Sequence, residues 1–159
     1  MVYDPHNDPD RDLARWLPAV GLVAVMIVLV IQFMREPIPP PPNASAFGCY
    51  ATVTAPSILL DESGMHINQE GFPKIGFHLE RHKQGIALTA EAPIYAEAGP
   101  EGYQYSVASR GIGKFLSFYK VIDGKLYGIF EADELELFRM LAEDGRNLPY
   151  ERTDQARCF

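Results

Sequence analysis

The amino-acid sequence predicts a single-pass transmembrane α-helix joined to a small, mainly-β soluble domain, a β-sandwich or barrel-like fold, with one C-terminal helix. One observation behind this fold class is an uncharged apolar run near the amino end, and the other is a series of short alternating segments after residue 47. Half-buried strands alternate apolar and polar residues, whereas membrane helices need about 20 apolar residues in succession. The predicted organisation is a polar cytoplasmic tail at 1–14, a transmembrane helix at 15–34, a proline-rich linker at 35–46 and an extracytoplasmic β-rich domain at 47–159.

The apolar run extends from Trp16 to Phe33 as WLPAVGLVAVMIVLVIQF, 18 residues without a charged side chain. A helix of this length spans about 27 Å at 1.5 Å per residue, which is close to the thickness of a hydrocarbon core. Pro18, Gly21 and Ala24 recur every three residues and form a candidate helix-packing face, because small side chains let a second helix approach closely. A lipid-facing helix that happens to contain small residues is the alternative.

Basic residues flank the run unequally, with Arg11 and Arg15 before it and Arg35 alone directly after it. Since cytoplasmic flanks carry the excess of Lys and Arg, the sequence favours a cytoplasmic N-terminus, a periplasmic C-terminal domain and an inner-membrane location. A cleaved signal peptide is the competing interpretation. It is disfavoured because the small-x-small motif at 44–46 lies more than ten residues beyond the run.

The linker is rich in proline, since residues 36–43 read EPIPPPPN. Such a segment favours extended polyproline II at about 3.1 Å per residue, and we expect it to act as a stiff spacer. A proline-rich ligand for an aromatic groove is the alternative, although a linker is the usual role of such a run beside an apolar helix.

Beyond residue 47 the chain reads as about nine short strands, rich in β-branched and aromatic residues and separated by turn residues. They cover 49–54, 57–60, 65–68, 73–82, 85–90, 93–96, 103–108, 114–122 and 125–131. The strongest turn signal is Asp123-Gly124 between the last two segments, because a type I′ turn needs two positive φ angles. We therefore expect these two strands to form an antiparallel hairpin. Residues 148–152 are a further candidate strand.

One helix is predicted after the ninth strand. Asp133 and Glu136 form a start that resembles a capping box, and Gly145 marks the expected end. The residues that share one face at helical spacing are Leu135, Phe138, Leu141 and Ala142. We expect this helix to cover one end or face of the sheet.

The chain has two cysteines, Cys49 and Cys158, which lie near the two ends of the predicted domain. In an oxidising compartment a bridge between them would close a loop of about 110 residues and stabilise the fold by about 4 to 5 kcal/mol in the chain-entropy model. Two unrelated thiols are equally compatible with the sequence. Both alternatives stay open at this point.

His78, Glu80 and His82 are the one cluster of residue types that bind metals at close spacing. On a strand all three side chains point to the same side, and two imidazoles with a carboxylate could hold zinc. The simpler interpretation is the solvated face of an amphipathic strand, because same-side residues lie nearly 7 Å apart and reach one ion poorly. The cluster is therefore a weak candidate for a metal site.

Tyr103 and Tyr105 share one face of a predicted strand. If that face is exposed, it is a candidate contact surface, because tyrosine is enriched in the cores of interfaces. Packing in the core of the domain is the more frequent outcome.

The motifs that mark common enzymes do not occur, since the chain contains no G-x-S-x-G, H-E-x-x-H or C-x-x-C and no complete phosphate-binding loop. The sequence therefore predicts a protein that is not an enzyme and binds no cofactor. The net charge of −7 also argues against nucleic acid as a partner, because acidic surfaces repel phosphates.

The favoured function is a non-catalytic accessory or structural subunit of a larger membrane protein complex. Its expected partners are the other subunits and the lipid bilayer. The first alternative is a free-standing bitopic assembly factor or a module that binds a protein or ligand. A membrane-tethered metal-dependent enzyme, which would use His78, Glu80 and His82, is a less favoured third possibility.

Overall fold

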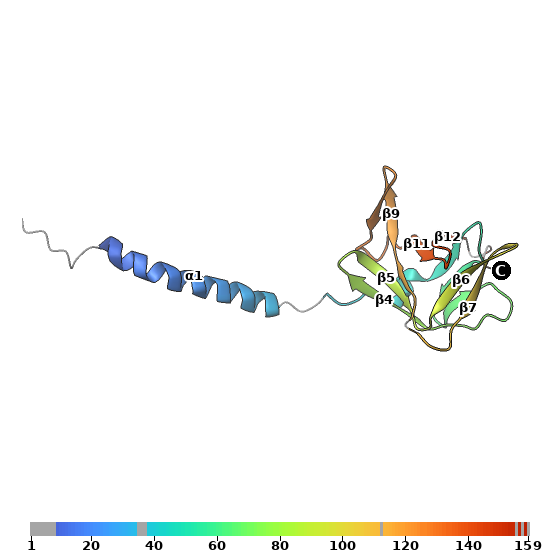
Figure 1. Ribbon diagram of the computed structural model, residues 1–159, viewed down its shortest axis with the longest axis horizontal. Coiled ribbons are helices and arrows are strands. Elements are labelled where there is room, and N and C mark those ends of the chain that lie inside the picture. Colours follow the sequence, from blue (N-terminus) through green and yellow to red (C-terminus); the bar gives the residue numbers. More distant parts are fainter. Residues whose placement is uncertain (1–8, 35–37, 112, 155, 157, 159) are drawn as a thin grey trace, which may run out of the picture. The chain divides into compact units, whose positions relative to one another are not determined.

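A computed structural model describes residues 9–34, 38–111, 113–154, 156 and 158 of the chain (Figure 1). The chain divides into two units, Met1–Ile38 and Pro39–Phe159. The first eight residues of the predicted tail and residues 35–37 of the predicted linker lie outside the described residues. Each unit is considered by itself below.

The first unit contains one helix, α1 (Pro9–Met34). No helix among the described residues is long and apolar enough to cross a membrane. The prediction of a transmembrane helix at 15–34 is therefore wrong, and so is the inner-membrane location that depended on it, with its cytoplasmic N-terminus and periplasmic domain.

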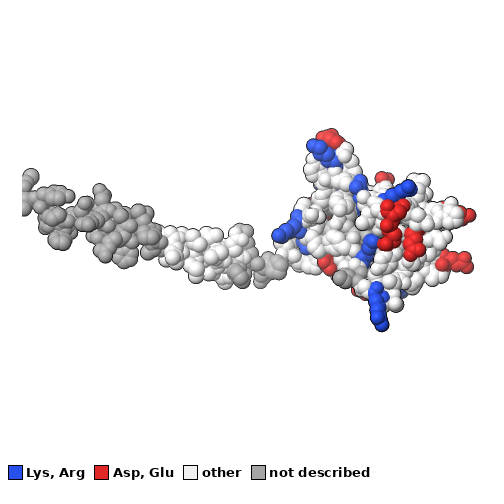
Figure 2. Space-filling view, viewed as in Figure 1, with Lys and Arg blue, Asp and Glu red and all other residues white. Residues whose placement is uncertain are grey.

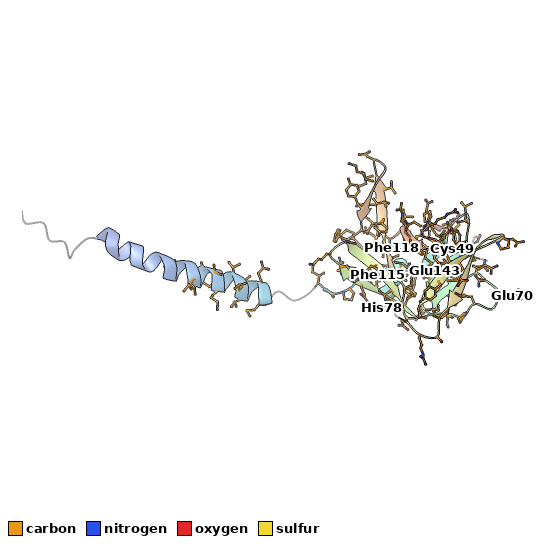
Figure 3. All side chains as sticks on the ribbon, in the orientation of Figure 1. Cys49, Glu70, His78, Phe115, Phe118 and Glu143 are labelled. Atoms are coloured by element: carbon orange, nitrogen blue, oxygen red, sulfur yellow. A yellow bond between two sulfur atoms is a disulfide. The ribbon has the colours of Figure 1, made fainter. Side chains whose placement is uncertain are left out.

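The side chains described along α1 are exposed (Figures 2 and 3). Gly21 and Ala24 of the predicted helix-packing face belong to this exposed part, and nothing lies within 4 Å of the place where Gly21 would carry a Cβ. The side chain of Pro18 lies outside the described residues. Helix packing at this face stays a prediction.

The second unit begins within the predicted linker. Pro42 has φ −65° and ψ 142°, which is polyproline II geometry, and the short 3-10 helix η1 (Asn43–Ala46) follows it. Pro41 is buried, and the side chain of Arg81 donates from Nε to the carbonyl oxygen of Pro39 at 3.2 Å. The end of the proline-rich segment therefore packs on the β-domain.

The largest sheet of this domain has five antiparallel strands in the order β11-β12-β1-β2-β3. Its strands are β1 (Gly48–Ala51), β2 (Ile58–Asp61), β3 (Gly64–Ile67), β11 (Leu137–Leu141) and β12 (Asn147–Thr153). β1 lies at the centre and pairs with β12, so the two ends of the domain's sequence meet side by side. The prediction of a β-rich domain is confirmed.

Three further sheets complete the domain. Their strands are β4 (Phe77–His82), β5 (Gly85–Ala90) and β8 (Phe115–Ser117) in one sheet, β6 (Ile94–Gly99) and β7 (Gly102–Val107) in a second, and β9 (Tyr119–Ile122) and β10 (Lys125–Gly128) in a third. Isolated bridges join the two larger sheets, Met65 to Ile75 beside β3 and Phe118 to Phe138 beside β11. The predicted strand at 114–122 is thus two strands, which belong to different sheets.

Aromatic side chains from both larger sheets meet in one core. The ring of Phe138 lies 5.1 Å from that of Tyr50, 5.6 Å from that of Phe118 and 5.3 Å from that of Tyr150, measured between centroids. All four residues are fully buried, and each such pair contributes about 0.5 to 1.5 kcal/mol beyond the area that it buries. The Tyr50 hydroxyl donates to the carbonyl oxygen of Leu135 at 2.9 Å. Burial raises the pKa of Tyr50 to about 12.

The helix predicted to start at Asp133 does not form, because β11 occupies 137–141 and pairs with β12 residue by residue. Phe138 and Met140 point into the core while their neighbours are more exposed, which is the period of a strand. The apolar residues of this segment also fit the helical spacing, and pairing with β12 decides between the two patterns. Gly145, with φ 82°, serves the turn between these strands instead of ending a helix.

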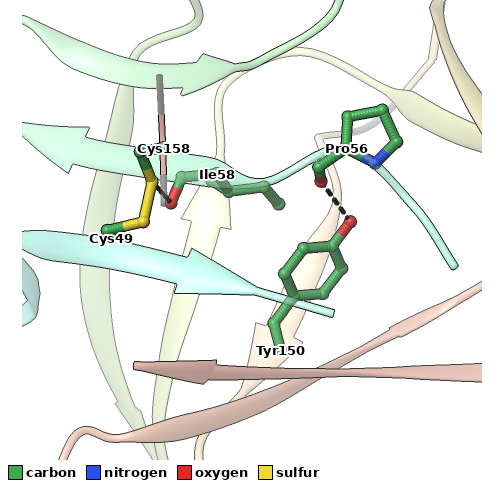
Figure 4. Close-up of a disulfide and its surroundings, with 5 residues drawn as sticks. All are labelled: Cys49, Pro56, Ile58, Tyr150 and Cys158. Carbon is green, nitrogen blue, oxygen red and sulfur yellow. Dashed lines mark hydrogen bonds between the residues drawn. A yellow bond between two sulfur atoms is a disulfide. The ribbon is translucent and has the colours of Figure 1, made fainter. Parts of the chain in front are cut away.

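Cys49 and Cys158 form a disulfide bond, which was one of the two alternatives that the sequence left open (Figure 4). The bond links residues 109 positions apart, and the chain-entropy model assigns a loop of this size about 4 to 5 kcal/mol of stabilisation. The sulfur of Cys158 lies 3.5 Å from the carbonyl oxygen of Ile58, so the bond is buried beside β2. The C-terminal end of the chain is thereby held against the central strand of the large sheet.

Candidate functional site

The metal-site candidate lies on the outer side of β4, where His78, Glu80 and His82 are neighbours as the sequence predicts. Nε2 of His78 lies 2.6 Å from Oε1 of Glu80, and Nε2 of His82 lies 3.2 Å from Oε2 of the same carboxylate. The hydrogen bond from His78 holds the pKa of Glu80 below its usual value. Nowhere among the described residues are three His, Cys, Asp or Glu side chains arranged to hold a metal ion. The geometry supports an exposed ion-pair cluster here.

A hydroxyl group lies near the same cluster, at Ser117. His82 packs edge-on against Phe115 with 4.4 Å between ring centroids, and both residues border a depression of about 330 Å³ that also includes Ser117. Glu80 orients His82, but within the described residues no hydrogen bond joins His82 to the Ser117 hydroxyl. A nucleophile needs that bond to be activated by a neighbouring base.

Tyr103 and Tyr105 are only 8% and 4% exposed, so they pack in the core, which was the more frequent expectation, and the condition for a contact surface at these residues is not met. Tyr105 forms a hydrogen bond with the Tyr150 hydroxyl inside the domain, and Tyr103 donates to Oδ2 of Asp144 at 2.8 Å. The pairing of β7 with β6 turns both tyrosines toward the core and leaves Gln104 between them on the outside.

The surface feature that stands apart from the rest of the domain is the β9–β10 hairpin, which projects from it (Figure 1). Asp123 and Gly124 have φ angles of 51° and 73°, and Ile122 pairs with Lys125 across them. Two positive φ angles in a two-residue loop are the type I′ geometry that Asp-Gly favours. The hairpin prediction at this turn is confirmed.

Apolar side chains are exposed on both faces of this hairpin. Val121 and Leu126 lie opposite each other on one face and are 57% and 38% exposed, while Ile122 and Tyr127 on the other face are 47% and 46% exposed. Figure 2 shows the body of the hairpin as mostly uncharged surface, with charged groups gathered at its tip. An isolated two-stranded hairpin is at best marginally stable in water, and contiguous apolar patches commonly mark interaction sites.

The hydrogen-bond pattern of the hairpin follows from its turn. In an antiparallel ladder, opposite residues alternate between pairs that exchange two backbone hydrogen bonds and pairs that exchange none. Ile122 and Lys125 flank the two-residue type I′ turn, and the residues that flank such a turn are a bonded pair. Two positions on, Lys120 and Tyr127 are the next bonded pair, and the pairs between are not bonded.

The outer edge of β9 is open at Val121. The backbone N–H and C=O groups of Tyr119 and Val121 belong to the pairs that are not bonded and point away from β10. Tyr119 follows the antiparallel bridge between Phe118 and Phe138, and because the N–H of Phe118 donates to Ile86, the flanking residues carry this bridge and Tyr119 is engaged with β11. The backbone of Val121 has no such partner among the described residues, since β9 pairs only with β10 there. An unpaired strand edge is a template for pairing with another strand.

A groove runs along this open edge. It has a volume of about 410 Å³ and is lined by Tyr119, Lys120, Val121, Asp133, Glu134, Glu136 and Leu137. It opens where β9 separates from β11 beyond the Phe118–Phe138 bridge, and Nζ of Lys120 lies 2.7 Å from Oε2 of Glu134 across it. Asp133 and Glu136 are exposed and form no ion pair with any described residue, so the groove carries a net negative charge.

Reasoning from the sequence found the hairpin but not its exposure. The signal that could have revealed it is the adjacent apolar pairs Val121-Ile122 and Leu126-Tyr127, because an alternating strand with one buried face does not place two large apolar residues in succession.

Comparisons with protein-family models, with curated proteins and with solved structures find no match to this chain.

Proposed function

We propose that this chain is a non-catalytic subunit or adaptor of a protein assembly and that its β-domain binds a partner protein through the β9–β10 hairpin. The observation that carries the proposal is the exposure of large apolar side chains on both faces of a hairpin that projects from the domain. A partner that covers these side chains removes apolar surface from water, which contributes about 25 cal/mol per Å².

The rest of the domain supports an interaction role. The aromatic core, the disulfide and the paired strands hold the base of the hairpin in place, and Phe118 at that base is fully buried. Interfaces gain affinity when the binding element is fixed before the partner arrives, because less freedom is lost on association.

The test is capture of a partner by the full-length chain and by two variants of matched chemistry. The double variant Val121→Asp, Leu126→Asp places charge on one face of the hairpin. The control Val53→Asp introduces a single aspartate at an apolar residue that is fully exposed elsewhere on the domain. Thermal unfolding and circular dichroism verify that both variants fold.

We expect the wild-type chain and the Val53→Asp control to bind the same protein in fixed stoichiometry, as measured by quantitative mass spectrometry after affinity purification. The hairpin variant should lose that protein. A partner that binds all three chains equally, or a wild-type chain that purifies without any stoichiometric partner from its own source, contradicts the proposal.

A further inference from the structure

Two strand edges of the β-domain are covered by side-chain amides. Asn43 donates from Nδ2 to the carbonyl oxygen of Phe77 at 3.0 Å and accepts the N–H of Leu79 on Oδ1 at 3.0 Å, which satisfies the edge of β4. Gln69 donates from Nε2 to the carbonyl oxygen of Tyr105 at 2.8 Å and accepts its N–H on Oε1 at 2.7 Å, which satisfies the edge of β7. Each amide imitates the backbone of one residue in a neighbouring strand.

β9 differs from both beyond the Phe118–Phe138 bridge, because the outward backbone groups of Val121 receive no such partner from the described residues. The segment across the groove begins beside β9 at the Phe118–Phe138 bridge and then diverges, so it leaves room along the strand instead of pairing with it. Exposed strand edges invite pairing with another chain, and proteins usually cover or charge them.

From these two observations we propose that an extended segment of the partner protein adds to the hairpin as a third strand along β9, in the groove beside Glu134. The inference rests on the proposed function and specifies how the partner binds. Main-chain hydrogen bonds to Val121 supply affinity, while alternate side chains of the added strand supply specificity.

The charges of the groove define the added segment. Every second side chain of the added segment faces the acids Asp133 and Glu136. The residues at these positions of the partner are Lys or Arg. The intervening side chains are apolar and pack on the face of the hairpin that carries Val121 and Leu126. A second copy of this chain fits poorly, because its net charge of −7 brings more negative charge to an acidic groove.

The probe is the peptide acetyl-Lys-Val-Lys-Val-Lys-Val-amide with a fluorescent label, and its binding to the full-length chain is measured by fluorescence anisotropy. The variant Val121→Pro removes an N–H that points into the groove. The matched control Leu126→Pro removes an N–H that points outward from the opposite strand of the same hairpin. Both substitutions lie at edge positions whose N–H is not used within the hairpin, where proline is tolerated.

We expect the peptide to bind the wild-type chain and Leu126→Pro with similar affinity and to bind Val121→Pro at least about tenfold more weakly. A Glu-Val peptide of the same length should also bind weakly, since its carboxylates repel the groove. Equal binding to the two proline variants overturns the addition to β9, and a peptide that does not bind the wild-type chain overturns the stated chemistry of the partner.

These outcomes are distinct from failure of the proposed function. If Val121→Pro still captures the partner while the aspartate variant of the hairpin does not, the hairpin is the binding site and strand addition is wrong. If sedimentation shows that the chain alone forms a dimer that Val121→Pro disrupts, a second copy occupies the edge and the proposal of a basic partner segment is overturned.

Discussion

Two hairpins of the same domain have opposite environments. In β4–β5 the apolar residues Leu79 and Leu88 lie opposite each other and are almost fully buried, β8 pairs with the edge of β5, and Asn43 covers the edge of β4. In β9–β10 the opposite residues Val121 and Leu126 are exposed, and the backbone of Val121 at the edge of β9 has no partner among the described residues. Both hairpins have regular strand pairing. They differ in whether other parts of the domain cover their side chains and edges, and not in secondary structure.

The comparison shows why apolar residues alone do not identify a core. β4 alternates, with apolar side chains inward and the ion-paired residues His78 and Glu80 outward. The β9–β10 hairpin places apolar residues on both faces, and a sheet of two strands has no second layer to bury either of them. A hairpin of that kind gains stability from whatever covers it, which is the basis of the proposed partner.

The largest expected effect is the difference in stability loss between a buried leucine in one hairpin and an exposed leucine in the other, when each is shortened to alanine. Leu88→Ala in β5 should lower the free energy of unfolding by about 2 to 5 kcal/mol, because it leaves a cavity in the core. Leu126→Ala in β10 should change it by about 0.5 kcal/mol or less, as is usual for exposed positions. Urea unfolding of the isolated protein measures both. Similar losses at the two leucines would show that the hairpin is packed in the free protein.

A smaller effect is expected at the covered edge of β4. Asn43→Ala removes the amide that bonds Phe77 and Leu79, and we expect a loss of about 1 to 2 kcal/mol because two strand groups lose their partner. Asn68→Ala changes an exposed asparagine without this role and serves as the control. If both substitutions have the same effect in urea unfolding, the amide does not protect the edge.

Alkaline pH should lower the free energy of unfolding, because the core of the domain contains buried tyrosines. Burial raises the pKa of Tyr50 and of Tyr105 to about 12, so both hydroxyls keep their protons in the folded state after the unfolded chain has lost them near pH 10. The unfolded state then binds fewer protons, and the free energy of unfolding should fall as the pH rises from 10 to 12. Urea unfolding across this range tests the expectation, and Tyr50→Phe should reduce the fall. A flat profile would contradict it.

The smallest effect is expected on the outer face of β4. The hydrogen bond from His78 holds the pKa of Glu80 below its usual value, so the carboxylate contributes stability above that usual pKa and loses it as the pH falls through the lowered pKa. The pair is exposed, and Glu80→Gln should cost less than about 1 kcal/mol at neutral pH. Unfolding of the wild type and the variant should converge in acid. A difference that persists there would rule out ionisation as the cause.

Much of the β-domain was readable from the sequence because its signals are local. The Asp123-Gly124 turn specifies its own backbone geometry, and segments such as 85–90 alternate as strands require. The pairing of β11 with β12 was not readable, because the residues of β11 fit two patterns. Phe138 and Met140 have the spacing of a strand, whereas Leu135 and Phe138 have the spacing of a helix. The strand forms because this segment pairs with β12, which lies in a later part of the sequence.

The candidate site was only partly readable. Sequence spacing placed His78, Glu80 and His82 on one side of a strand, and the structure agrees on the side while showing an ion-pair cluster. The open edge of β9 could not be found, because a free edge is defined by the absence of a neighbour in space. The exposure of Val121 likewise depends on how β9 diverges from β11 and not on residue type.

Amide hydrogen exchange of the full-length chain, resolved by residue, tests the central claim most directly. The account predicts that the N–H group of Val121 exchanges rapidly in the free protein and is protected when the Lys-Val peptide or the captured partner is added. The N–H groups of Leu79 and Tyr105, which bond to side-chain amides, should be protected throughout. Equal protection of Val121 and Leu79 in the free protein, or no gain of protection at Val121 on binding, would contradict the account.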